Sequence, residues 1–187
     1  MIEPAIRIAT YEDLFTIPEN MIGEIIEGEL TATPRPSRRH TEAVSSLGGE
    51  LLPPYKFGRG GPGGWIIHYE PEIAFTTDIL VPDLAGWKRA RFPVDEDHNW
   101  ISVAPDWVCE VLSPSTFRKD KIKKMRIYAQ HQVPYVWLID PLAKILEAYM
   151  LEAQRWVVLG VYAEEDKIRV EPFQEVEIDL MNLWLVA

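Results

Sequence analysis

Cysteine is almost absent from this sequence: among its 187 residues only Cys109 is a cysteine. A single cysteine cannot form a disulfide within the chain, which is typical of proteins in a reducing compartment. We therefore expect a cytoplasmic protein. The first ten residues lack the apolar segment of a secretion signal. No stretch approaches the ~18 uninterrupted apolar residues of a membrane span, so we expect no membrane partner.

Basic charge is also scarce, since 19 Lys and Arg residues stand against 29 Asp and Glu residues and leave a net charge of −10. Nucleic-acid binding depends on Lys and Arg, so this balance argues mildly against a nucleic-acid partner. The distribution is more informative than the sum. Two clusters are basic: one holds Arg35, Arg38 and Arg39, and the other holds Arg118, Lys119, Lys121, Lys123, Lys124 and Arg126. A solvated helix face accounts equally well for such a run.

The order of apolar segments predicts an α/β fold, in one domain over residues 1–187. Trp107–Leu112 and Tyr135–Ile139 are short apolar runs typical of buried strands. Between them, Asp120–His131 is predicted to be a helix with Asp120 as its N-cap. A helix between two buried strands favours their parallel pairing in a mixed central sheet flanked by helices.

Further elements are expected on both sides of this unit. His40–Leu52 carries apolar residues at helical spacing and is followed by Pro53 and Pro54, which should stop the helix. Ile79–Trp87 is predicted to be a strand interrupted by Pro82. At the end of the chain, a C-terminal antiparallel meander is predicted over Ile145–Met150, Trp156–Tyr162 and Ile168–Val170.

Glu110 is the most informative single residue. Side chains alternate along a strand, so Trp107, Cys109 and Val111 take one face, and Val108, Glu110 and Leu112 take the other. Both faces are apolar, which predicts a central strand. A carboxylate there is costly unless it is protonated, paired or bound to a metal. A structural ion pair and a metal ligand both satisfy that requirement.

Asp83 is the second candidate, because it follows Pro82 in the apolar run 79–85. A turn aspartate is the plain interpretation, since Pro before Asp often marks a turn. Two acids on neighbouring strands can also share one divalent cation, which prefers carboxylate oxygen. Pro105-Asp106 is a competing pair, but Asp106 and Glu110 would lie ~13 Å apart along one strand, so Asp83 is preferred.

Lys124 is the third candidate. On the predicted helix, Ile122, Met125 and Ala129 form the buried stripe, and Lys124 lies beside it with Lys121 and Tyr128. From such a border a long side chain can bend over the end of the sheet. An exposed lysine is the ordinary alternative.

Together, Asp83, Glu110 and Lys124 resemble the active site of PD-(D/E)xK nucleases, although Leu112 stands where the lysine of that motif is usually found. The wider pattern resembles the Uma-two family of restriction-endonuclease-like proteins over about residues 10–150. The segments that carry this resemblance are 24–30, Pro36-Ser37 with His40, 82–84, Pro105-Asp106, 110–115, Asp120 with Lys124 and Tyr128, and 133–141.

The resemblance implies a restriction-endonuclease-like core and metal-dependent hydrolysis of nucleic acid, with DNA the expected substrate. It places the catalytic acids at Asp83 and Glu110, as ligands of Mg²⁺ or Mn²⁺, and the catalytic lysine at Lys124. Glu24 and His40 also match family positions and are supporting candidates. Residues expected to bind nucleic acid are Arg38, Arg39, Lys119, Lys121 and Lys123.

Two other classes of function stay open: a non-catalytic nucleic-acid-binding module and a protein-interaction domain, each on a nuclease fold. A homodimer would cut both strands most simply. The apolar end Leu183–Val186 would either complete the core or join subunits.

Overall fold

The computed structural model describes residues 7–94 and 97–185. Its helical elements are α1 (Tyr11–Leu14), α2 (Arg38–Leu51), α3 (Met125–Gln130), the π turns η1 (Leu52–Lys56) and η3 (Lys119–Lys124), and the 3-10 turns η2 (Arg89–Arg91) and η4 (Leu180–Leu183). The strands are β1 (Met21–Ile26), β2 (Glu29–Pro34), β3 (Trp65–Tyr69), β4 (Ile73–Phe75), β5 (Asp78–Leu80), β6 (Leu84–Lys88), β7 (Trp107–Val111), β8 (Tyr135–Asp140), β9 (Ile145–Glu152), β10 (Arg155–Ala163), β11 (Lys167–Ile168) and β12 (Ile178–Asp179). No helix of the described residues is long and apolar enough to cross a membrane.

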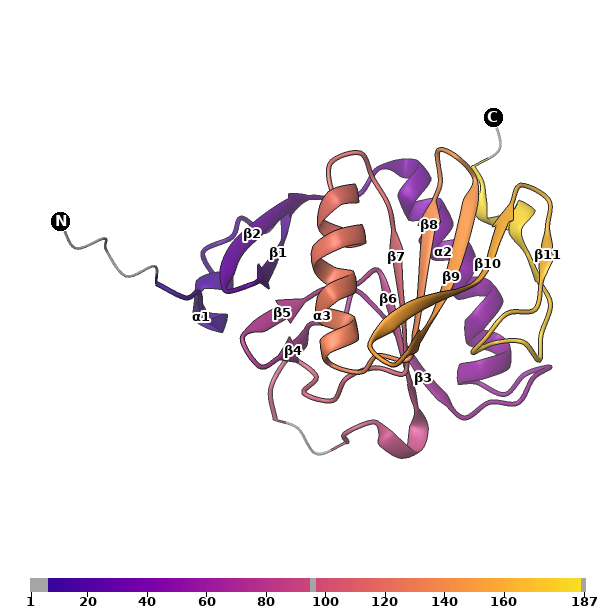
Figure 1. The fold of residues 1–187 in the computed structure, drawn as a ribbon, viewed down its shortest axis with the longest axis horizontal. Helices are drawn as coiled ribbons and strands as arrows, with labels where there is room; N and C mark the ends of the chain where they lie inside the picture. The colour runs from indigo at the N-terminus through magenta and orange to yellow at the C-terminus, as the bar shows by residue number, and fades with distance from the viewer. Residues whose placement is uncertain (1–6, 95–96, 186–187) are drawn as a thin grey trace.

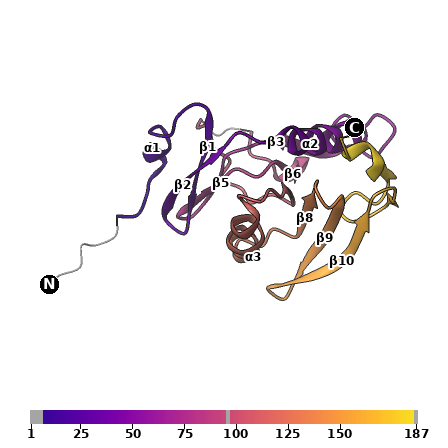
Figure 2. The same cartoon turned by 90° about the horizontal axis from the view of Figure 1, so that it is seen from above.

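A six-stranded mixed sheet forms the centre of the molecule, in the order β10-β9-β8-β7-β6-β3 (Figure 1). The strands β7 and β8 are parallel, and every other neighbouring pair in this sheet is antiparallel. The helix that joins β7 to β8 packs on one face, and α2 lies on the other (Figure 2). The predicted mixed α/β sheet flanked by helices is therefore confirmed.

Strand β7 divides the core as its alternation predicts. Trp107, Cys109 and Val111 belong to the hydrophobic cluster under α2, while Val108 and Leu112 belong to the cluster under α3. Both faces are covered, so all five residues of β7 are buried. Glu110 consequently points into the layer beneath α3, where an unpaired charge would be costly.

The sequence 24–31, with Gly28 in the bend, predicts a strand, a turn and a strand, and the antiparallel pairing of β1 with β2 confirms it. The extension of this hairpin into a second, four-stranded antiparallel sheet in the order β2-β1-β5-β4 was not predicted. The segment Ile79–Trp87 does not form one interrupted strand. Its first part is β5, in the four-stranded sheet, and its second part is β6, in the six-stranded sheet. Because proline has no amide to donate to a ladder, Pro82 marks the point where the chain changes sheets.

Helix α2 begins with a capped turn and ends in an unexpected way. The hydroxyl of Ser37 accepts the amide of His40 at 3.4 Å, which satisfies one free donor of the first turn. The α-helix ends at Leu51, but Pro53 and Pro54 lie inside the π turn η1 and do not end the helical path. Gly48 lets the Tyr69 ring lie against this helix, since a Cβ there would be 1.5 Å from the hydroxyl oxygen of Tyr69 and would force that side chain to move.

The helix after β7 contains a π turn that the sequence pattern did not predict. Helical structure begins at Phe117, so Asp120 lies inside the helix and is not its N-cap. The amide of Met125 donates to the carbonyl of Asp120, five residues earlier. A π turn holds more residues than the α period assumes, which rotates the buried face. Ile122, predicted to be buried, is 49% exposed, whereas Lys124, predicted at the border, is 2% exposed.

The predicted C-terminal meander is confirmed for its first two strands, β9 and β10, which pair antiparallel, but not for its predicted last strand. Ile168 belongs to β11, which pairs with β12 in a separate two-stranded sheet. Leu183 and Trp184 are buried in the cluster under α2 and complete the core. Leu185 is 43% exposed, and Val186 lies outside the described residues.

Candidate active site

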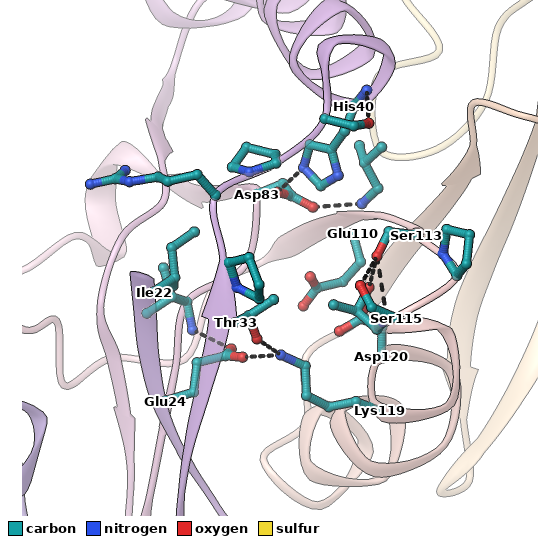
Figure 3. Close-up of a pocket in the computed structure, with 18 of the residues that line it drawn as sticks. Ile22, Glu24, Thr33, His40, Asp83, Glu110, Ser113, Ser115, Lys119 and Asp120 are labelled. Carbon is teal, nitrogen blue, oxygen red and sulfur yellow. Dashed lines mark hydrogen bonds and ion pairs between the residues drawn. The ribbon is translucent and has the colours of Figure 1, made fainter. Parts of the chain in front are cut away.

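The five residues nominated from the sequence line one pocket of about 270 Å³. They come from five parts of the chain: Glu24 from β1, His40 from α2, Asp83 from the residue just before β6, Glu110 from β7 and Lys124 from η3. Residues 33–37, at the end of β2 and in the loop after it, and the loop 113–116 form the walls of the pocket (Figure 3). The fold therefore brings together side chains that are up to 100 positions apart in the sequence.

Asp83 ties three elements together at the edge of this pocket. Its Oδ2 accepts the amide of Val111, the last residue of β7, at 2.6 Å. Its Oδ1 lies 2.6 Å from Nε2 of His40, in the first turn of α2. Pro82 lies between β5, which belongs to the four-stranded sheet, and β6, which belongs to the six-stranded sheet. The carboxylate of Asp83, the next residue, is therefore placed between the two sheets. His40 thus contacts the candidate acid directly.

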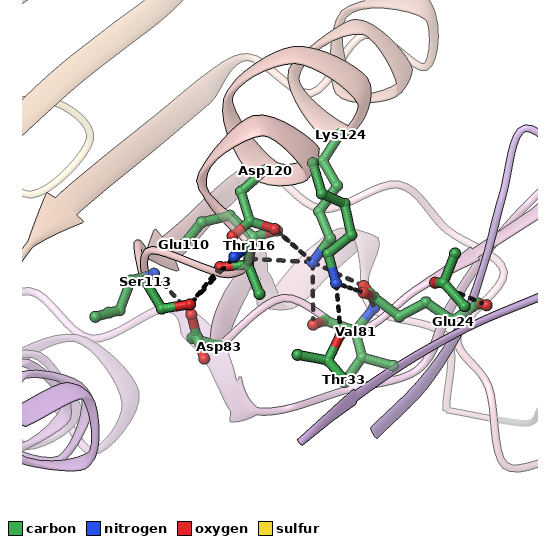
Figure 4. A network of polar contacts seen from close by, with 12 residues as sticks. Glu24, Thr33, Val81, Asp83, Glu110, Ser113, Thr116, Asp120 and Lys124 are labelled. Carbon is green, nitrogen blue, oxygen red and sulfur yellow. Dashed lines mark hydrogen bonds and ion pairs between the residues drawn. The ribbon is translucent and has the colours of Figure 1, made fainter. Parts of the chain in front are cut away.

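Lys124 is a buried ammonium group surrounded by carboxylates (Figure 4). Its Nζ lies 2.7 Å from Glu24, 3.1 Å from Glu110 and 3.6 Å from Asp120. Burial alone lowers the pKa of Lys124, but the three carboxylates outweigh burial and raise this pKa well above its ordinary value. Lys124 is therefore a fixed positive charge at the base of the pocket.

Glu110 is the most strongly affected acid. It accepts the hydroxyl of Tyr128 at 2.5 Å and faces Lys124 with both oxygens, at 3.1 and 3.2 Å. Burial raises the pKa of Glu110 well above its ordinary value, Lys124 opposes that shift, and the charges of Asp120, Asp83 and Glu24 add to it. The site thus concentrates negative charge around Glu110.

Glu24 has a different electrostatic environment. Its Oε1 accepts the amide of Val81 at 2.9 Å, and its Oε2 lies 2.6 Å from Nζ of Lys119. Burial raises the pKa of Glu24, but Lys124 and Lys119 together outweigh burial and hold this pKa below its ordinary value. Glu24 is therefore ionised and fixes the two ammonium groups in the pocket.

The donor set fits a hard divalent cation that keeps part of its water shell. With every carboxyl ionised, four carboxylates (Glu24, Asp83, Glu110 and Asp120) face three cationic side chains (Arg35, Lys119 and Lys124), a surplus of one negative charge. Mg²⁺ is usually held by one or two carboxylates and several waters. Over residues 7–94 and 97–185, however, no group of three or more His, Cys, Asp or Glu side chains could hold a metal ion as the side chains lie. A bound Mg²⁺ would therefore need water, or a rearrangement of the carboxylates, to complete its ligands.

The basic run of the helix is largely neutralised by acids of other elements. Lys119 also donates to Thr33 at 2.9 Å. The ion pairs of the run are Lys119 with Glu24, Lys121 with Glu147, Lys123 with Glu27, and Arg126 with Glu27. By contrast, Arg38 and Arg39 are exposed and form no ion pair with any residue that the structure describes.

Sequence reasoning missed two members of the site. Asp120, predicted to be an N-cap, contacts Lys124, and Tyr128 donates to Glu110. Their spacing was the available signal, because Asp120, Lys124 and Tyr128 recur every four residues and share one helix face. The competing Asp106 is bound by Arg91 and by the amide of Lys88, and it does not line the pocket.

Comparisons with known proteins agree with this architecture. None of the curated proteins matches the chain. A crystal structure described as a putative nuclease belonging to DUF820 from Anabaena variabilis ATCC 29413 is 24% identical and superimposes with a TM-score of 0.71. The match covers 94% of this chain and 97% of that chain, and it shows a shared fold. The family described as "Uma2: Putative restriction endonuclease" matches residues 8–181, so the chain belongs to the Uma2 family.

Proposed function

We propose that this chain is a metal-dependent nuclease that hydrolyses phosphodiester bonds of DNA. One observation carries the proposal: Asp83, Glu110 and the buried Lys124 line the same pocket, in a chain of a family described as restriction endonucleases. Neither the fold nor the negative charge of the pocket would by itself support a nuclease. Asp83 and Glu110 supply acids for a cation, and Lys124 supplies a fixed positive charge for a phosphate.

Asp83 and Glu110 are the proposed ligands of Mg²⁺ or Mn²⁺, with the carbonyl of Val111 as a third. When bound, the cation supplies a water of lowered pKa and positive charge for the scissile phosphate. His40 positions Asp83 through its 2.6 Å contact, and the amide of Val111 holds the other oxygen. The carboxylate is therefore aimed before the substrate arrives.

Lys124 is the proposed electrostatic catalyst. Glu24 and Asp120 hold its ammonium group beside Glu110, so it is oriented without rearrangement. Such preorganised charge stabilises the extra negative charge that develops on the phosphate during hydrolysis. Tyr128 fixes Glu110 from the opposite direction.

The proposed contacts to the DNA backbone are made by the two groups of basic residues. Arg38 and Arg39 are free to bind phosphates, while Lys119, Lys121 and Lys123 would first exchange their carboxylate partners for phosphate. Contacts of this kind position the duplex without reading its sequence. A homodimer would present two such sites to the two strands.

A nuclease assay with divalent metal tests the proposal. The wild type is compared with Asp83→Asn and with the matched control Asp106→Asn, because each aspartate follows a proline but only Asp83 lines the pocket. We expect Mg²⁺- or Mn²⁺-dependent cleavage by the wild type and by Asp106→Asn, and none by Asp83→Asn. Equal cleavage by all three proteins would reject the proposed site.

A non-catalytic domain on the same fold is the second candidate. It is favoured by the hydrogen bonds that already occupy both oxygens of Asp83 and by the ion pair between Glu110 and Lys124. A purely structural network would need no metal. Thermal stabilisation by metal, present for an enzyme site and absent for an interaction domain, separates these two candidates.

A further inference from the structure

A second pocket, of about 250 Å³, adjoins the candidate active site. Both pockets are lined by Ser113 and Pro114, so the turn after β7 is the wall between them. The carbonyl of Ser113 accepts the amides of Thr116 and Phe117 at 3.1 and 2.9 Å. Its hydroxyl lies 3.0 Å from the hydroxyls of Ser115 and Thr116 (Figure 3). This internally bonded turn fixes the spacing of the two pockets.

The second pocket carries exposed apolar side chains. Phe117 is 42% exposed and Leu142 is 57% exposed, while Leu112 is buried beside them. The ammonium group of Lys121 lies 5.6 Å from the centre of the Phe117 ring. Exposed aromatic rings next to cationic groups are the surfaces on which unpaired nucleobases stack.

The charges of this pocket favour a base over a phosphate. The carboxylate of Asp140 lines it, with Oδ1 accepting the amides of Leu142 and Ala143 at 2.9 Å each. A carboxylate repels phosphate but accepts hydrogen bonds from the amino groups of bases. Arg118 also lines the pocket and forms no ion pair within the described part of the chain, so its guanidinium is available to a phosphate.

We propose that this second pocket binds the unpaired base of the nucleotide next to the scissile phosphate. The base stacks on Phe117 with its polar edge toward Asp140, and Arg118 contacts the phosphate of the same nucleotide. The inference rests on the proposed function and adds a substrate class to it: a nucleic-acid strand that is single or unpaired at the point of cleavage. A fully paired base cannot reach Phe117, because it stays in the stack.

Fluorescence anisotropy with two labelled probes tests this inference. The probes are a short mixed-sequence single-stranded DNA and the blunt duplex of the same sequence, with Ca²⁺ in place of Mg²⁺ to suppress cleavage. Phe117→Ala is compared with the wild type and with Phe57→Ala. Phe57 is a matched control, since it is 56% exposed and has the guanidinium of Arg59 over its ring, 5.5 Å from the centroid, yet lines neither pocket.

We expect Phe117→Ala to weaken binding of the single strand by about tenfold and to leave duplex binding nearly unchanged. Phe57→Ala should bind both probes as the wild type does. The inference is wrong if Phe117→Ala retains full affinity for the single strand, if it weakens both probes equally, or if the wild type binds neither. Cleavage by the wild type and Asp83→Asn is measured in parallel. If cleavage requires Asp83 but the affinity for the single strand does not require Phe117, the base-binding pocket is rejected and the proposed nuclease function stands.

Discussion

At the scale of single residues, Lys124 is surrounded by more negative charge than it can neutralise. One carboxylate would suffice for a structural ion pair, yet Glu24, Glu110 and Asp120 all lie within 3.6 Å of its ammonium group. Each further buried carboxylate costs free energy of folding. Functional sites are commonly less stable than they would be if their residues were chosen for folding alone. The proposed cation site would account for this excess of acid.

Unequal effects of Lys124→Met and Glu110→Gln are expected from this arrangement. Removing the ammonium group leaves Glu110 and Asp120 buried without their ion-pair partner, while Glu24 keeps Lys119. Lys124→Met should therefore lower the free energy of unfolding by about 3–5 kcal/mol. Glu110→Gln leaves Lys124 with Glu24 and Asp120, and it should change the free energy of unfolding by only about 1 kcal/mol in chelator. Urea denaturation of both variants measures the difference. A Glu110→Gln variant as unstable as Lys124→Met would identify Glu110 as the indispensable structural partner of the lysine.

The residues of the site differ in how far the sequence predicts them. Glu110 is recognisable because a carboxylate stands in an apolar strand, and Asp83 because a proline precedes it. The burial of Lys124 is not predictable from the helix, because the carboxylate of Glu24 comes from a strand 100 positions earlier in the chain. Local periodicity contains no information on such distant contacts.

At the scale of elements, the π turn η3 decides which helix face meets the sheet. Helical periodicity placed Ile122 inside and Lys124 at the border, and the structure reverses this assignment. The alternation of β7 and its parallel pairing with β8 were predicted, since strand periodicity survives unless a bulge intervenes. A π turn adds one residue to a helical turn, and no residue type indicates where this happens.

The second sheet also escaped prediction. Its strands β4 and β5 have only three residues each, which is too short for an alternating pattern to be recognised.

Deleting Ile122 tests the importance of this turn. The side chain is 49% exposed, so its loss removes little packing, but a shorter segment restores the α period and changes the spacing of Asp120 and Lys124 from four residues to three. The turn that carries Lys119 and Asp120 is then rotated relative to Lys124. We expect the deletion variant to keep the far-ultraviolet circular dichroism of a helix and to lose nuclease activity. Ile122→Ala keeps the chain length and should retain activity. Equal activity of the two variants would show that the π turn does not position the site.

At the scale of the whole molecule, the net charge of −10 limits how DNA can be bound. The lysines that give the helix its basic sequence are paired with carboxylates of other elements, as in Lys123 with Glu27 of the turn between β1 and β2, and Lys121 with Glu147 of β9. A sequence count of positive residues therefore overestimates the available positive surface. The uncompensated arginines Arg38 and Arg39 are a better guide to where phosphates bind.

The salt dependence of DNA affinity distinguishes paired from free cations. Each phosphate contact contributes about 0.9 to the slope of log affinity against log salt. We expect Arg38→Gln and Arg39→Gln each to reduce this slope by about 1, and Lys121→Gln to reduce it by less, because DNA must first displace Glu147, which lies 2.6 Å from Lys121. Titrations of a duplex at several salt concentrations provide the slopes. An unchanged slope for Lys121→Gln would mean that DNA does not displace Glu147.

Metal binding should stabilise the whole molecule. The pocket has a surplus of one negative charge when all its carboxyls are ionised, and a bound cation relieves the repulsion between the carboxylates only in the folded state. At a metal concentration of about 100 times the dissociation constant, mass action adds roughly 2.7 kcal/mol to the free energy of unfolding. For a chain of this size that corresponds to a rise in melting temperature of about 5–10 °C.

We expect this rise with Mn²⁺ for the wild type and for Asp106→Asn, and its loss in Asp83→Asn. In EDTA, Asp83→Asn keeps an acceptor for the Val111 amide, so its melting temperature should stay close to that of the wild type. An equal rise in all three proteins would place the cation elsewhere on the acidic surface, and no rise in any of them would favour the non-catalytic domain.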